Sequence, residues 1–490
     1  MLLVLAFQGP VLLAVGVAML VPLLVAVWDS RGAPPRDEAS AYILPALLAL
    51  ALGRLLHHHR PAVTSLPKVE ALLITTAAWL TAGVFGAMPF VILLRMAPVE
   101  ALFESVSGFT TAGATMLSGL DQLPRSALLW RSLTQYLGGL GILLIVLLLR
   151  QSRGSQALSL LTAEGVKVSS GRLSLNFRRA AYRFAAIYVV LTAAEIVVLM
   201  LLKVSLYDSV SLALTTISTG GFAPHDESIA FFRNRPDVYP GFVAIEAVIV
   251  FFMIAGGTNF AVLYRVGRGQ LSALWGGLEV RLMWFVLGAA TAVVAVNSAA
   301  VLGGSMPDWL MRSGFEVASL VSTTGFETTA SGEFPRLSRE VIMALMIIGG
   351  CAGSTAGGIK LIRVGILTIF LRHEIRYLRL PSRAVDPPRI DGEVIPDSAF
   401  RQAAFILLLW LAYVAVTGFA ISGLAPHLSL SEAYSTALAA IGVFGPSFAT
   451  VAEVASLPGS AKLLLIGGML AGRLEILPLL VFLNPAAWRQ

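Results

Sequence analysis

Charged side chains and cysteine are both scarce in this sequence of 490 residues. Asp, Glu, Lys and Arg together make up only 13% of the chain, whereas 57% of its residues are hydrophobic. A water-soluble protein of this length needs far more polar surface, so the composition excludes a soluble globular protein, a disordered chain and a coiled coil. The single cysteine, Cys351, excludes an intramolecular disulfide, a thiolate metal cluster and a CxxC redox pair.

Motifs of enzymes and of cofactor-binding proteins are also missing. The sequence has no HExxH, no GxSxG and no paired aspartates within its apolar runs, and no GxGxxG follows a predicted strand. We therefore predict that the chain is not an enzyme and holds no organic cofactor. The net charge of +7 is modest, and it does not indicate a nucleic-acid partner.

Long apolar runs dominate what is present. A transmembrane helix needs about 20 mostly apolar residues. About ten runs meet this requirement, at roughly 2–28, 41–56, 69–95, 126–149, 180–202, 241–264, 281–302, 339–371, 399–423 and 461–483. The 45 glycines and 24 prolines are too many for uninterrupted helices, so we predict an all-α integral membrane protein with some broken spans. The first run lacks a basic n-region, and we expect that it is not a cleaved signal peptide.

Basic residues concentrate in alternate loops, between spans two and three, four and five, six and seven, and eight and nine. The opposite loops carry most of the acids between spans. By the positive-inside rule, the basic side is cytoplasmic, and both termini are expected in the cytoplasm.

Four segments of the opposite loops align without gaps when Gly113, Gly221, Gly325 and Gly445 are superposed. Each contains a short semi-polar helix of about ten residues, which is about 15 Å long and cannot cross a bilayer. Three of these helices begin with an acid, at Glu100, Asp208 and Glu432, which suits a helix N-terminus. The sequence therefore predicts four repeats of spanning helix, short helix, glycine turn and spanning helix.

A Thr-, Ser- and Gly-rich stretch follows each short helix and ends at the aligned glycine. Non-helical backbone at membrane depth survives only where it faces protein or water. One such turn alone would indicate a plain loop reversal, but four in register favour a pore in which backbone carbonyls replace the hydration shell of a cation. The predicted cation site consists of Thr111, Ala112, Gly113, Thr219, Gly220, Gly221, Thr323, Thr324, Gly325, Val443, Phe444 and Gly445.

These residues resemble the Trk/Ktr/HKT superfamily of potassium transporters, most closely the TrkH family, over nearly the whole chain. The stretches that carry the resemblance are Gly108–Thr115, Ser218–Phe222, Gly349–Lys360, Gly472–Glu475 and Asn484–Trp488. The resemblance implies four pseudo-symmetric repeats around one pore, preceded by two further transmembrane helices. The expected boundaries are 1–66 for the two helices and 67–152, 176–268, 278–375 and 396–490 for the repeats.

The resemblance further implies that K⁺ is the transported ion and that the chain forms a homodimer among the lipids of a bacterial inner membrane. It implies cytosolic nucleotide-binding regulatory subunits, which must be separate chains. Glycine at position 113 suggests potassium, because family members with serine there favour sodium. The fourth loop departs from the family pattern Gly-Asn-Val-Gly-Pro and reads Gly442-Val-Phe-Gly-Pro446, which bears on filter rigidity and on the sharpness of ion selection.

A glycine-rich stretch interrupts the third repeat's second span. Half of residues 349–358 are glycine, each costing about 1 kcal/mol against alanine in a helix, so a straight helix is not expected. In the resembling family this stretch is an intramembrane loop that obstructs the pore, whereas the alternative is a GxxxG helix contact. The predicted gate consists of Gly349, Gly350, Gly353, Ser354, Thr355, Gly357, Gly358, Lys360 and Arg473.

Two members of this set are cations. Arg473 lies near the middle of the last span, where a charge must face protein or water. The resemblance places it beside the loop, and the alternative is a structural pair with Glu195 or Glu246. Lys360 either acts in the gate or reaches the inner membrane surface.

We therefore predict potassium uptake through a carbonyl-lined filter gated by this loop. The alternative is a secondary transporter coupled to protons or sodium, and passive flux is not distinguished from coupled flux. A transporter of organic solutes would be expected to have inverted repeats, whereas these repeats run in one direction.

Overall fold

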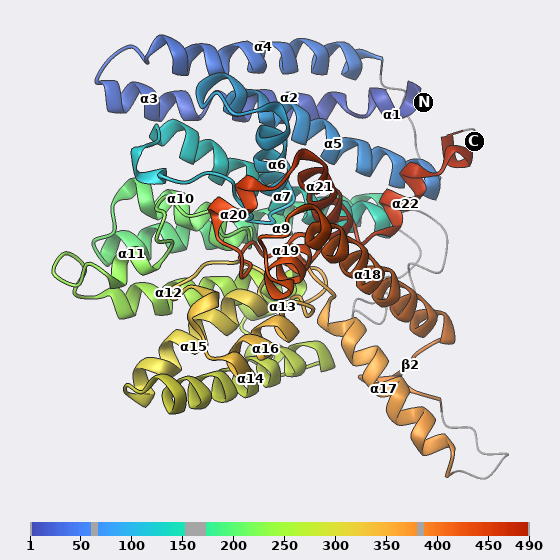
Figure 1. Ribbon diagram of the computed structural model, residues 1–490. Helices are drawn as coiled ribbons and strands as arrows, with labels where there is room; N and C mark the ends of the chain where they lie inside the picture. The colour runs from blue at the N-terminus through green and yellow to red at the C-terminus, as the bar shows by residue number, and fades with distance from the viewer. Residues whose placement is uncertain (1, 60–66, 152–172, 380–386, 489–490) are drawn as a thin grey trace.

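The computed structural model describes residues 2–59, 67–151, 173–379 and 387–488, and it is built almost entirely of helices (Figure 1). Parts of the basic loops, at 60–66, 152–172 and 380–386, lie outside the described residues. In the described part, the two strands are β1 (Arg389–Ile390) and β2 (Glu393–Val394), an antiparallel hairpin between the third and fourth repeats.

The N-terminal segment is a broken helix packed against a continuous one. Its pieces are α1 (Leu2–Ala6), α2 (Gly9–Ala18) and α3 (Pro22–Ser30), and the continuous helix is α4 (Arg36–His58). The helices can approach closely because glycines face the contact: a Cβ on Gly9 would lie 2.6 Å from the His57 backbone nitrogen. The pair forms a layer over α5 at the top of Figure 1.

The rest of the chain contains four units, each with a long helix followed by a short one. The first unit has α5 (Lys68–Leu93), α6 (Pro98–Phe109), η1 (Leu120–Gln122) and α7 (Arg125–Gln151). The second has α9 (Leu173–Leu201), α10 (Leu206–Ile217), α11 (Ala230–Arg233), α12 (Phe242–Gly257), α13 (Phe260–Gly267) and η2 (Leu271–Leu274). The third has α14 (Leu278–Leu302), α15 (Met306–Val321), η3 (Ser331–Glu333), α16 (Arg336–Leu345) and α17 (Leu361–Tyr377). The fourth has α18 (Asp397–Leu424), α19 (Leu430–Gly442), α20 (Val451–Ser456), α21 (Gly459–Arg473), α22 (Leu477–Leu483) and η4 (Pro485–Trp488).

Several of the predicted spans prove to be broken. The span at 241–264 bends by 113° between α12 and α13, where Gly256-Gly257 ends one helix and the Asn259 side chain caps the next. The span at 339–371 is interrupted by residues 346–360, which are not helical. The last span ends at Arg473 and resumes at Leu477, and Glu475 between them has a positive φ.

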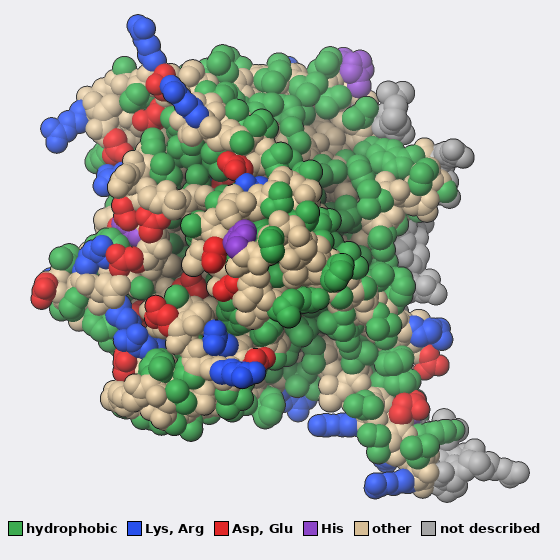
Figure 2. Space-filling view, in the orientation of Figure 1, with side chains coloured by type: hydrophobic (Ala, Val, Ile, Leu, Met, Phe, Trp, Pro, Cys, Tyr) green, Lys and Arg blue, Asp and Glu red, His purple; other side chains and the backbone are tan. Residues whose placement is uncertain are grey.

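Six of the described helical segments are long and apolar enough to cross a membrane: Leu3–Ser30, Arg36–His58, Val69–Leu93, Arg179–Leu201, Leu278–Leu302 and Asp397–Leu424. Their outward faces carry large exposed apolar side chains, such as Leu44 on α4, Phe285 on α14 and Phe419 on α18. Figure 2 shows hydrophobic side chains over much of the surface, with charged ones along the left edge, in patches across the centre of this face and around the end of α17. Such a belt suits contact with lipid. The two chain ends lie on the same side of the molecule (Figure 1).

The four short helices, α6, α10, α15 and α19, have 12, 12, 16 and 13 residues. All four carry an acid in the first turn, whereas the sequence predicted three. Alignment on the glycines places Arg312 where the other three segments have Glu100, Asp208 and Glu432, and this predicts a helix start there. The third helix instead begins at Met306, so its N-terminal acid is Asp308, whose backbone N–H the Ser305 side chain caps. The hydroxyl group of Ser305 favours this earlier start because it satisfies an N–H that the first turn leaves free. Each short helix packs against the long helix before it.

Candidate ion pathway

The four stretches after the short helices, called the filter loops below, share one unusual backbone geometry. In each, a β-branched residue has a positive φ and the aligned glycine two positions later does too. The φ values are 56° at Thr111, 54° at Thr219, 57° at Thr323 and 58° at Val443, then 73° at Gly113, 77° at Gly221, 84° at Gly325 and 85° at Gly445. Positive φ is rare for β-branched residues. The repeated positive φ values set these stretches apart from an ordinary strand.

The filter loops contact one another in a fixed cyclic order. In every repeat, the aligned glycine lies against the carbonyl oxygen that precedes the aligned glycine of the next repeat. The distances from an added Cβ measure how close these contacts are. A Cβ on Gly113 would lie 2.2 Å from the Gly220 oxygen, and a Cβ on Gly221 would lie 1.9 Å from the Thr324 oxygen. A Cβ on Gly325 would lie 1.9 Å from the Phe444 oxygen, and a Cβ on Gly445 would lie 3.1 Å from the Ala112 oxygen. The fourth repeat thus meets the first, and the loops form a closed ring.

A cavity of about 370 Å³, called the vestibule below, opens onto this ring. All four aligned glycines line it, together with polar and charged side chains that include Arg131, His225, Glu327 and Glu333. The ring therefore lies at the base of a space large enough for several water molecules.

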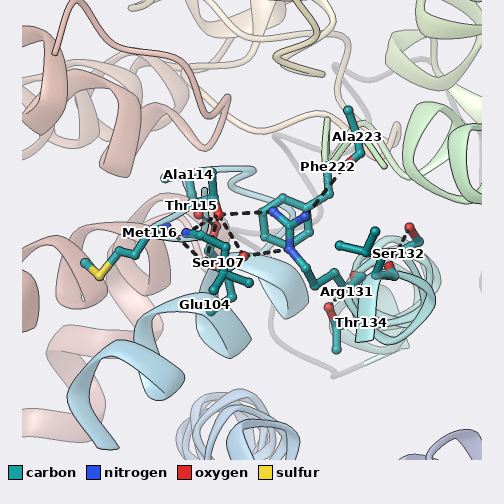
Figure 3. Close-up of polar contacts among 12 residues, drawn as sticks. Glu104, Ser107, Ala114, Thr115, Met116, Arg131, Ser132, Thr134, Phe222 and Ala223 are labelled. Atoms are coloured by element: carbon teal, nitrogen blue, oxygen red, sulfur yellow. Dashed lines mark hydrogen bonds and ion pairs between the residues drawn. The ribbon is translucent and has the colours of Figure 1, made fainter. Parts of the chain in front are cut away.

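A buried ion pair supports the first filter loop (Figure 3). The Arg131 Nε of α7 lies 2.7 Å from a carboxylate oxygen of Glu104 on α6, and both side chains are almost fully buried. Glu104 also accepts hydrogen bonds from the Thr115 hydroxyl at 2.9 Å and the Met116 N–H at 3.1 Å. The Arg131 guanidinium lies 4.1 Å from the centre of the Phe222 ring, which belongs to the second filter loop. One pair thus joins a short helix, its own loop and the neighbouring loop.

Gln135, which the sequence did not single out, holds the second filter loop. Its amide N–H donates to the Gly220 carbonyl at 2.7 Å, and its amide oxygen accepts from the Phe222 N–H at 3.0 Å. The signal in the sequence was a run of polar residues on an apolar helix, at Arg131, Thr134 and Gln135. Such residues at membrane depth indicate specific partners.

The fourth filter loop accommodates Phe444 by turning its ring away from the vestibule. The side chain is buried and packs among apolar residues of the core. It lies against Gly442, where an added Cβ would stand 2.1 Å from the ring. Val443, which replaces the asparagine of the family pattern, takes the left-handed conformation that asparagine tolerates more readily.

Residues 346–360, called the intramembrane loop below, lie against two filter loops and the end of a third short helix. The Thr355 hydroxyl donates to the Ile217 carbonyl at the end of α10, at 2.9 Å. The Gly357 N–H donates to the Thr323 hydroxyl at 2.6 Å, and a Cβ on Gly357 would lie 2.7 Å from the Gly442 oxygen. The loop thus contacts repeats two, three and four beside the C-terminal ends of their short helices.

Arg473 bonds to backbone oxygens and, among the residues that the structure describes, to no acid. Its guanidinium donates to the Thr355 carbonyl at 2.6 Å and to the Gly138 carbonyl of α7 at 3.3 Å, and the side chain is buried. Glu246, one of the two alternative partners, is paired with Arg233 at 2.6 Å. Arg473 therefore joins the intramembrane loop to the first repeat.

Lys360 also bonds to carbonyls of the intramembrane loop, those of Ala356 and Gly357. Glu475, near Arg473 in sequence, pairs with Arg363 instead. The sites predicted for the filter and for the gate are thus adjacent, because the N–H of Gly357 in the gate donates to the hydroxyl of Thr323 in the filter.

A family model described as TrkH, cation transport protein, matches residues 46–487. The Trk system potassium uptake protein TrkH of Vibrio parahaemolyticus is 30% identical over 492 residues, covering 98% of each chain. TrkH of Salmonella typhimurium is 29% identical over 504 residues, covering 100% of this chain and 98% of the relative. A crystal structure of the potassium transporter TrkH from Vibrio parahaemolyticus matches with a TM-score of 0.85 and 28% identity, covering 100% of this chain and 99% of that one.

Proposed function

Because the chain belongs to the TrkH family of cation transport proteins, we propose that it carries potassium ions across the bacterial inner membrane into the cell. The closed ring of four filter loops is the observation that carries this proposal, since such a ring presents carbonyl oxygens from all sides to one ion. The relatives named potassium uptake proteins support the choice of ion.

In this proposal the ion passes from the vestibule through the filter residues predicted from the sequence. The C-terminal ends of α6, α10, α15 and α19 approach the ring, and their partial negative charge favours a cation. Entry is driven by the membrane potential, at about 2.3 kcal/mol per charge per 100 mV.

The intramembrane loop is the proposed gate, and hydrogen bonds from Arg473 and Lys360 hold it in place. Both cations occupy loop carbonyls that the helix break leaves free. Opening the path requires the loop to give up its bonds to Thr323 in the filter and to the end of α10. Those bonds couple the gate to the filter.

We also propose a homodimer, with nucleotide-binding regulatory subunits as separate chains at the cytoplasmic face and both termini on that face. The division into two N-terminal helices and four pore repeats, with the boundaries predicted above, belongs to the same proposal. It is supported by the positive φ pattern, which occurs once per repeat.

Flux of K⁺ against Na⁺ in proteoliposomes, with a fixed membrane potential, tests the proposed function. We expect K⁺ flux that exceeds Na⁺ flux and needs no pH or sodium gradient. Flux that appears only with such a gradient would support coupled transport. Equal flux of both ions, or none after the intramembrane loop is loosened, would contradict the proposal.

Two glycine-to-alanine variants give a matched comparison. In Gly325→Ala, the new Cβ would stand 1.9 Å from the Phe444 oxygen, at a residue with positive φ, so we expect K⁺ flux to be lost. In Gly332→Ala, on the same vestibule wall, the Cβ would meet open space, so flux should remain at the wild-type level.

A further inference from the structure

Two carboxyl groups of the third repeat share one serine hydroxyl beside the vestibule. The Ser331 Oγ lies 2.8 Å from Glu316 Oε1 and 2.9 Å from Glu327 Oε1. The Ser331 N–H also donates to Glu327 Oε1, at 3.2 Å. A serine hydroxyl has one hydrogen to donate. If both carboxyls were ionised, one of the two short contacts would place two lone pairs against each other.

In the first repeat, the carboxyl group at the equivalent position is paired with an arginine. Glu104 and Glu316 stand at the same distance before their aligned glycines, and Glu104 is neutralised by Arg131 at 2.7 Å. Thr115, which donates to Glu104, is replaced in the third repeat by Glu327. The third repeat thus has a second acid where the first has a donor.

No cation compensates Glu316 in the described part of the chain. The residue is 1% exposed, it receives one hydrogen bond, from Ser331, and its Oε2 has no hydrogen-bond partner. An ionised carboxylate buried in this way is strongly disfavoured.

In the described part of the chain, no charged group around α15 forms an ion pair with Glu316. Arg312, one turn earlier on α15, binds Asp308 at 2.8 Å. Glu246 of α12 pairs with Arg233. The other charged residues on the elements packed around α15 are Glu279 and Arg281 of α14, Arg336, Arg339 and Glu340 of α16, and Glu333 of η3.

We propose that Glu316 is a proton-binding site, whose carboxylic acid donates to the Ser331 hydroxyl, while that hydroxyl donates to an ionised Glu327. This order of donors satisfies both short contacts. A proton, rather than a metal ion, fits the position because Ser331 and Glu327 line the vestibule and Glu316 does not. Ser331 therefore forms the path by which a proton reaches Glu316.

The site makes the charge of the vestibule depend on pH. Loss of the proton adds a negative charge behind Glu327, next to the ring, and a negative charge there raises the local concentration of cations. This consequence for transport rests on the proposed function, whereas the bound proton does not.

Infrared difference spectroscopy of the purified protein with ¹³C-labelled glutamate tests the proton directly. We expect a protonated-carboxyl stretching band at neutral pH that shifts with the label and loses intensity in Glu316→Gln, whereas any contribution from the buried Glu195 stays the same in both spectra. The matched control, Glu333→Gln, removes an exposed glutamate from the same vestibule wall and should retain the band. Absence of the band in the wild type, or bands of equal intensity in the wild type and Glu316→Gln, would overturn the proposal.

Glu327→Gln tests whether Glu316 binds a proton whose affinity depends on Glu327, or whether Glu316 has only a structural role. This variant also serves as the test if Glu316→Gln does not assemble. Removing the neighbouring negative charge should move the pH at which the band disappears downward, by about one pH unit or more. An unchanged midpoint would contradict the coupling of the two groups. None of these readouts depends on ion flux, so their failure is distinct from failure of the proposed function.

Discussion

Four β-branched residues in the left-handed conformation are the costliest single positions of the ring. Residues in such conformations cost roughly 1–3 kcal/mol each and persist only where their surroundings hold them. Here the surroundings are known: the short helix before each residue and the aligned glycine of the preceding repeat. Local backbone strain is thus concentrated in the filter loops. The surroundings that maintain this strain also hold the carbonyl groups of these loops in place.

A serine at Gly113 should disturb ion selection more than a serine at Gly445. Both glycines have positive φ, but an added Cβ would lie 2.2 Å from the Gly220 oxygen in the first case and 3.1 Å from its nearest atom in the second. We therefore expect a markedly lower K⁺/Na⁺ permeability ratio in Gly113→Ser and a smaller change in Gly445→Ser. Equal ratios in the wild type and Gly113→Ser would refute the filter assignment.

Replacement of Arg473 by alanine should raise flux per assembled molecule. The change frees the Thr355 carbonyl and removes a positive charge that repels cations below the ring. Arg473→Lys keeps the charge but loses the second donor group, so an intermediate flux is expected. The measurement is vesicle flux normalised to the amount of inserted protein. Reduced yield with unchanged flux per molecule would instead indicate a structural arginine.

At the scale of elements, the intramembrane loop is a short segment whose two ends already meet. Ile348 and Ile359 form a bridge, and a Cβ on Gly349 would lie 2.9 Å from the Gly358 Cα. The residues between can therefore be removed without separating α16 from α17. Most residues of the intramembrane loop are buried, and Cys351 and Ile359 belong to the same core cluster as Phe444, so its opening must disrupt packing beside the ring.

Deletion of residues 350–357 should raise basal flux several-fold while the protein still inserts. Thr355→Val tests the same contact more gently, because it removes the hydroxyl that donates to the Ile217 and Gly256 carbonyls at nearly the same volume. Thr368→Val is the control, since that hydroxyl bonds only within α17. Wild-type or lower flux in the inserted deletion variant would show that the loop is not the gate.

The sequence predicted those elements whose signals are local. Apolar runs of sufficient length, a short helix with an N-terminal acid and an aligned glycine all lie within a few residues of each other, so the repeats could be predicted from them, and the filter positions stay a prediction. The start of α15 was wrong because alignment on the glycines hid Ser305 and Asp308, which lie seven and four residues before Arg312. Two other features could not be predicted, the bend between α12 and α13 and the ion pair of Glu104 with Arg131. Both depend on residues that are distant in sequence and come together only in the folded chain.

At the scale of the whole molecule, the repeats are joined at the vestibule side by charged contacts as well as by the ring. His225, after the second filter loop, lies 2.5 Å from Asp121 of the first repeat and 3.4 Å from Asp208 of its own. Lys462 of the fourth repeat binds Glu100 of the first at 2.8 Å. These contacts hold the same neighbours together that the ring brings into contact.

The contact of His225 should make stability depend on pH. Burial lowers the pKa of His225, but hydrogen bonds and charges from Asp208 and Asp121 outweigh it and raise the pKa above the usual value. A raised pKa means that the stabilisation is complete below about pH 6.5, the unfolded value, and is lost as pH rises through the folded pKa.

Thermal unfolding of the wild type and His225→Gln between about pH 5 and pH 9 checks this. We expect the wild type to be more stable at acidic pH and the difference to shrink at alkaline pH. His427→Gln is the control, because His427 is exposed and its ring contacts only the Ser456 hydroxyl in the described part of the chain. A difference that grows with pH would contradict the assignment.

The closure of the ring by its fourth member also sets an order on biosynthesis. The ribosome makes the N-terminal repeats first, so the first three filter loops exist before Gly445, Lys462 and Arg473 have been made. Until then Ala112 lacks its contact with Gly445, and Glu100 lacks its ion pair with Lys462. The intramembrane loop also lacks Arg473, which links it to α7. A chain cut short by a premature stop codon would therefore insert as a ring open on one side, with polar backbone facing lipid, and would be a ready substrate for membrane proteases.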